Sequence, residues 1–110
     1  MAYNGKPFFK IPRPLLLAGG FEAKTIADGH TLTDKDSLFQ SINGGGSDRN
    51  IVLPAEKDGR VYCIKNAGAS HDLDVQNDSA VLLVKLSPKE VAVLVSSGTD
   101  WHVMINVTNH

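Results

Sequence analysis

The sequence predicts an all-β protein: a compact antiparallel β-sandwich or jelly-roll-like barrel preceded by an extended N-terminal arm. Short apolar runs, rich in Val, Leu and Ile, recur about every 8–12 residues in the second half of the chain. Turn sequences such as Asp28-Gly29 and Asn77-Asp78-Ser79 separate the runs. The chain has 110 residues, which fits one domain. We therefore expect an arm over residues 1–20 and a β-sandwich body over residues 21–110.

The expected arm is rich in proline. Pro7, Pro12 and Pro14 each remove a backbone donor and push the preceding residue toward extended geometry. Residues 1–20 carry three of the eleven basic residues and none of the twelve acidic ones. The arm is also apolar, so we expect it to lie against the body, a neighbouring subunit or a larger partner, the alternative being a solvated tail. The residues expected to make this contact are Phe8, Phe9, Lys10, Ile11, Arg13, Leu15, Leu16 and Leu17.

Residues 32–42 allow two interpretations. Leu38, Phe39 and Ile42 have the spacing of a helical turn, but they also fit a loop followed by a strand. We favour the loop and strand, because the run is short and ends in Gly44-Gly45-Gly46.

The strand expected over residues 60–66 is apolar on both faces. Val61 and Cys63 lie on one face, and Tyr62 and Ile64 on the other. A strand of this kind is typical of a sheet that is covered on both sides.

The last two expected strands are separated by a hairpin-like turn at Ser97-Gly98-Thr99-Asp100. Both are rich in β-branched residues. We expect Val91, Val93 and Val95 to share one face of the first strand, and Trp101, Val103, Ile105 and Val107 to share one face of the second.

Residue types that occur in active sites are present without the spacing of a site. Ser70-His71-Asp72 are adjacent, whereas a catalytic triad is assembled from separated elements, so we interpret them as a polar turn. Asp72, Asp74 and Asp78 lack the glycine and terminal glutamate of a hand-type calcium loop. The four histidines have no ligand spacing, and the glycine run lacks the lysine of a phosphate-binding loop. We expect no enzyme, and no catalytic, cofactor or metal site.

The net charge, the cysteine count and the length of the apolar runs limit the kinds of partner that we expect. A net charge of −1 gives no general affinity for nucleic acid. A single cysteine excludes an internal disulfide and a cysteine-based zinc site. Leu15-Leu16-Leu17-Ala18 is too short for a signal core or a membrane span. We expect a soluble protein that is made in a cytoplasm and contacts neither membrane nor nucleic acid.

An ordered set of motifs in this chain resembles a known module. Its pieces include Leu53-Pro54-Ala55, Gly59 through Asn66, and Ser97-Gly98-Thr99-Asp100-Trp101. Together they are similar to a small β-module of tailed-bacteriophage virion proteins, of the form "LPxAxxGxxYxIKN … PGExVxLxSDGTxWxV". The resemblance covers roughly residues 31–103. Lys89 stands where the module usually has glycine, and Ser97 stands where it has an acid.

The resemblance implies a structural role in a virus particle. Such modules occur in capsid-decoration or cement proteins, head fibres and tail fibres, are commonly trimeric, and attach through an N-terminal segment. The expected function is a capsid-decoration protein on the outer surface of the capsid, with the major capsid protein as partner and a homotrimer as assembly. The arm residues would be the capsid or subunit contact. The alternative is a fibre or tail module that binds a host receptor or glycan. Trp101 and Tyr62 would then form a sugar-stacking patch, but we favour core packing as the role of this pair.

Overall fold

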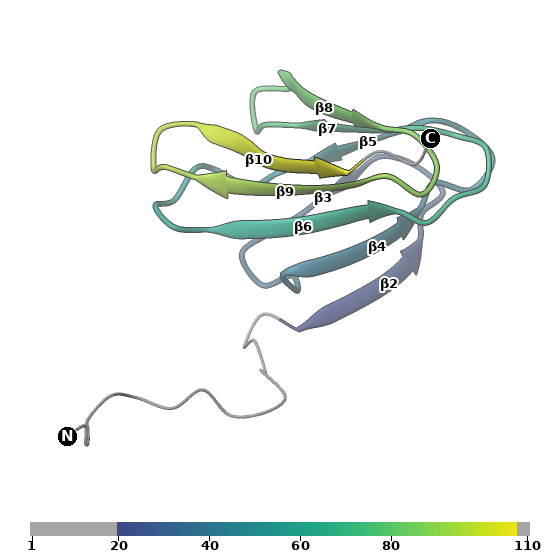
Figure 1. Cartoon of the computed structure of the whole chain (residues 1–110), viewed down its shortest axis with the longest axis horizontal. Coiled ribbons are helices and arrows are strands. Elements are labelled where there is room, and N and C mark those ends of the chain that lie inside the picture. Colours follow the sequence, from purple (N-terminus) through teal and green to yellow (C-terminus); the bar gives the residue numbers. More distant parts are fainter. Residues whose placement is uncertain (1–19, 108–110) are drawn as a thin grey trace.

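Figure 1 shows the computed structural model, which describes residues 20–107. These residues form nine strands and no helix, so none of them belongs to a helix that could cross a membrane. The expectation of an all-β body is confirmed. The strands are β2 (Phe21–Thr25), β3 (His30–Thr31), β4 (Phe39–Asn43), β5 (Arg49–Val52), β6 (Val61–Asn66), β7 (Leu73–Gln76), β8 (Leu82–Leu86), β9 (Val91–Ser96) and β10 (Trp101–Val107).

The strands form two mixed sheets that pack face to face. The order is β10-β9-β6-β4-β2 in the five-stranded sheet and β3-β5-β7-β8 in the four-stranded sheet. From β2 to β7 successive strands alternate between the two sheets. Within each sheet, every new strand lies beside the previous one and parallel to it. The last three strands then pair antiparallel. The first part of the body is therefore a short solenoid with one strand of each turn in each sheet. The β9–β10 hairpin then completes the larger sheet.

The predicted antiparallel sandwich is wrong in this respect. Strands β2, β4 and β6 are parallel to one another, and so are β3, β5 and β7. The connections from β2 to β3, from β4 to β5 and from β6 to β7 cross to the other sheet instead of folding back as hairpins. A repeat of three strand pairs results, although the sequence shows no tandem repeat.

The core lies between the two sheets. It is made of aliphatic side chains from the inner faces, together with Tyr62 and Trp101. Leu32 and Leu53, just beyond β3 and β5, extend it. Its fully buried members include Leu32, Ile42, Ile51, Leu53, Ile64, Leu73, Val75, Leu86, Ala92 and Leu94.

The β4 region and the turns agree with the sequence. The loop-and-strand interpretation of residues 32–42 is confirmed, because β4 begins at Phe39. Gly59 and Gly98 have φ of +79° and +95°, the left-handed region that glycine adopts without strain. Lys89 has φ of +73°, in the left-handed region that favours glycine, the residue usual at this position in the modules that the chain resembles.

The final strand differs from the expectation that one face holds all its apolar residues. The register of β10 shifts between Val103 and Ile105, where Met104 is the extra residue of a bulge. Trp101 and Val103 pair with residues of the inner face, whereas Ile105 and Val107 pair with Val93 and Val91 on the outer face. The bulge moves two apolar side chains from the core side to the outside of the sheet.

Candidate interaction surface

Among residues 20–107, the structure does not arrange Ser70, His71 and Asp72 as a catalytic triad. The partner of His71 is Asp48, with its Nδ1 3.5 Å from a carboxylate oxygen of that residue. The backbone N–H of Asp72 donates to the same oxygen, and this bond, more than the charge of His71, lowers the pKa of the Asp48 carboxyl. Ser70-His71-Asp72 therefore form a polar turn and not a triad.

The carboxylates suggested for a calcium loop do not gather into a metal site within the described part of the chain. Asp74 accepts a hydrogen bond from the Lys85 ammonium at 2.7 Å, which raises the pKa of Lys85. Between residues 20 and 107, no group of three His, Cys, Asp or Glu side chains is placed to hold a metal ion.

Tyr62 and Trp101 are core residues. Both are almost fully buried, their ring centroids are 5.9 Å apart, and the planes are tilted by 41°. The Trp101 Nε1–H donates to the carbonyl of Pro54 at 3.0 Å, and the Tyr62 hydroxyl donates to the carbonyl of Thr33. A sugar could not stack on rings that are covered in this way, so the core-packing interpretation of this pair is confirmed.

The outer face of the four-stranded sheet is mainly polar. One row across its strands joins Asn50, Asp74 and Lys85. The next row joins Thr31, Val52 and Gln76, with the exposed Leu82 opposite Gln76 at the margin. This is the surface expected of a sheet that faces water on one side.

The outer face of the five-stranded sheet is apolar. A row of directly paired residues crosses all five strands: Phe21, Phe39, Cys63, Val93 and Ile105. The next row crosses the same strands through Ala23, Ser41, Lys65, Val91 and Val107. Val61 and Val95 extend the apolar area toward the other end of β6 and β9, where the exposed His102 of β10 pairs with Val95 and borders it. We call this surface, defined by the two rows with Val61 and Val95, the apolar face.

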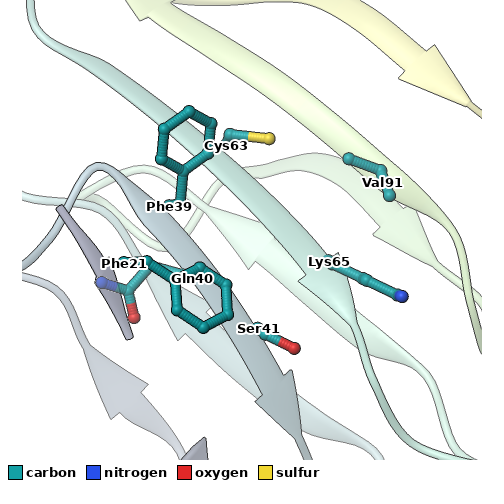
Figure 2. Close-up of a pocket in the computed structure, with 7 residues that line it drawn as sticks. All are labelled: Phe21, Phe39, Gln40, Ser41, Cys63, Lys65 and Val91. Carbon is teal, nitrogen blue, oxygen red and sulfur yellow. The ribbon is translucent and has the colours of Figure 1, made fainter. Parts of the chain in front are cut away.

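The apolar face is open to solvent in the single chain. Phe21 is 66% exposed, Ile105 53% and Val107 55%, while the central residues are half-buried. A hollow of about 290 Å³ lies over β2, β4 and β6, between Phe21, Phe39, Cys63 and Lys65. Figure 2 shows these side chains gathered on the same side of the sheet. Partial burial raises the pKa of the Cys63 thiol, so this cysteine is not an activated nucleophile.

The sequence contained part of the signal for this surface. The two-sided apolar character of β6 and the three outward valines of β9 indicated a covered sheet. Phe21, Phe39 and Ile105 were missed, because only the pairing of distant strands aligns them with Cys63 and Val93.

The predicted contact residues of the arm lie outside the described residues. These are Phe8, Phe9, Lys10, Ile11, Arg13, Leu15, Leu16 and Leu17.

Comparisons of the chain with family models, with curated proteins and with solved structures found no match. The resemblance to phage virion modules remains a prediction from the sequence motifs.

Proposed function

We propose that this chain is a structural protein of a tailed-phage virion, a capsid-decoration or cement protein. In this proposal the β body forms a homotrimer on the outer surface of the capsid. The N-terminal arm binds the major capsid protein and stabilises the head. The protein is made in the host cytoplasm and has no enzymatic activity.

The observation that carries the proposal is the contrast between the two outer faces of the body. One is polar, as in a domain that works alone in water, and the other is apolar across five strands. Contiguous apolar surface of this kind is typical of proteins that act by binding other proteins. The ordered motifs from Leu53 to Trp101 supply the virion setting by resemblance.

The chemistry of the arm supports its role in attachment. Its aromatic and aliphatic side chains would each add about 25 cal/mol per Å² of apolar surface buried on the capsid. Its three basic residues suit an acidic protein surface. Three arms in one trimer would bind together, which multiplies the affinity through effective concentration.

The test is binding to capsids that lack the protein. The wild-type chain should sediment with them, and a double variant Phe8→Ser and Phe9→Ser should not, while its circular dichroism stays that of the wild type. A matched pair of changes on the polar outer face, Asn50→Ser and Gln76→Ser, should leave binding intact. Full occupancy by the arm variant would refute attachment through the arm. Binding to a glycan array with no binding to capsids would favour the fibre alternative.

A further inference from the structure

The residues of the apolar face are contiguous, unlike single apolar residues scattered over a surface. Its central row joins Phe21, Phe39, Cys63, Val93 and Ile105 by direct cross-strand pairing from one edge of the sheet to the other. Within the rows that define the face there is no acidic side chain, and Lys65 is the one charged residue. Lys65 is exposed and belongs to the row nearer the end of β6, so its stem can lie along the apolar surface while its ammonium stays in water.

The size of the face suits association with another sheet. Five strands at a spacing of about 4.8 Å, each about five residues long, give a projected area of roughly 350 Å². Side-chain relief makes the accessible area larger, so two copies together would bury on the order of 1,000 Å², the lower bound for a specific interface. Sheets pack face to face about 10 Å apart through interdigitated aliphatic side chains, and the outward valines of β9 are suited to this packing.

The charge of the face argues against the chain's own arm as its occupant. The arm carries Lys6, Lys10 and Arg13 and no acid. The two rows offer these cations no carboxylate and contain a cation of their own at Lys65. A second copy brings an equally apolar surface, and the long side chain of the exposed Lys65 can extend so that its ammonium stays in water.

We propose that the apolar face of the five-stranded sheet is the surface through which copies of this chain associate. The inference rests on the assembly of copies in the proposed function and names the residues that form their contact; the mass measurement below gives the number of copies. It assigns the central contact to Phe39, Cys63 and Val93. It leaves the polar face of the four-stranded sheet exposed on the assembly.

The first test changes one outward valine on each outer face. Val93→Lys places a charge in the middle of the apolar face, and Val52→Lys makes the same change on a central strand of the polar face. Both valines are half-buried and point away from the core, so the two variants match in chemistry and position. Light scattering after gel filtration, or sedimentation equilibrium, gives the mass of each protein.

We expect the wild type and Val52→Lys to be oligomers and Val93→Lys to be a monomer. A charge buried without a partner should weaken association by at least about a hundredfold. A wild-type chain that is monomeric at high micromolar concentration would overturn the inference. An oligomer that survives Val93→Lys with unchanged affinity would overturn it as well.

The second test needs no variant, because Cys63 lies on the apolar face and is the single cysteine of the chain. Its rate of alkylation by a maleimide should be low in the oligomer and should rise as the wild-type protein is diluted until it dissociates. Slow labelling that is independent of concentration but is lost when residues 1–19 are removed would mean that the arm covers the face, and would refute the proposal. Labelling at one rate at all concentrations, in an oligomer of constant mass, would place the interface elsewhere and also refute it.

The result of the self-association tests can be distinguished from the result of the capsid-binding test. If Val93→Lys is monomeric and still binds capsids through its arm, more weakly because avidity is lost, both proposals stand. If the wild type oligomerises through the apolar face but never binds capsids, self-association stands and the decoration function fails.

Discussion

Replacing Asn66 should destabilise the body more than any exposed substitution, because this side chain joins three segments of backbone. Asn66 is fully buried at the end of β6. Its Nδ2 donates to the carbonyls of His71 and Leu86, each at 2.8 Å, and its Oδ1 accepts from the N–H of Gly68 at 2.9 Å. Truncation to alanine removes three hydrogen bonds of about 1 kcal/mol each and leaves their backbone partners without the side chain. Asn66→Ala should therefore cost about 3 kcal/mol.

The assay is urea unfolding followed by far-ultraviolet circular dichroism, at one protein concentration, because self-association would make stability depend on concentration. A loss of about 3 kcal/mol corresponds to a fall in Tm of roughly 12–24 °C for a body of this size. Asn66→Asp keeps the shape but cannot donate when ionised, so it should be at least as damaging at neutral pH and should recover partly when the carboxyl is protonated. Asn50→Ala, on the exposed outer face, is the control and should change stability by less than about 0.5 kcal/mol. If Asn66→Ala costs less than the control, or Asn66→Asp matches the wild type at neutral pH, the bonding argument is wrong.

Three further changes test other parts of the fold. Gly59 has φ of +79° and open space around its α-carbon, so Gly59→Ala should cost about 1 kcal/mol in denaturant unfolding through backbone strain alone, whereas Gly46→Ala, equally open, should not destabilise. Hydrogen bonds from the Gln40 side chain and from the Ser37 amide lower the pKa of Glu22 in the folded state. The Glu22 carboxylate therefore stabilises the fold above its unfolded pKa, and this contribution is lost as pH falls through the folded pKa. Glu22→Gln should flatten the decline of Tm between about pH 5 and pH 3, and an unchanged slope would contradict the assignment. Trp101→Phe removes the donor to Pro54 and part of the core packing, and should cost about 2 kcal/mol by circular dichroism; a cost near zero would mean that this bond contributes nothing.

The positions of the strands could be predicted from the sequence, but their pairing could not. Alternation of apolar and polar residues is the same in parallel and antiparallel strands, so it locates β7 and β9 without choosing their neighbours. Turn residues gave the two hairpins, at residues 77–80 and 97–100. The connections that cross between the sheets carry turn residues too, such as Asp28-Gly29 and Gly44-Gly45-Gly46, but these do not show whether the chain folds back as a hairpin or crosses over. The strands that follow are aligned by the burial of Ile42, Ile51 and Ile64 in one core.

The bulge in β10 was missed for a related reason. Trp101, Val103, Ile105 and Val107 fit the period of two that predicts a single face. The pairing with β9 skips Met104, and the residues after it therefore change sides. A bulge is a property of two paired strands, and the sequence of one strand does not show it.

The preference of strands for β-branched residues does not explain the apolar face. If it did, the outer faces of both sheets would be apolar, since the preference applies to the strands of both. The four-stranded sheet instead places Asn50, Asp74 and Lys85 across its outer face. In β9 all three outward positions hold valine, whereas the buried positions hold Ala92, Leu94 and Ser96, so the outside of this strand is as apolar as its core side. In the proposed assembly, another copy of the chain provides a second layer over this outer face, and that layer matches it in width and chemistry.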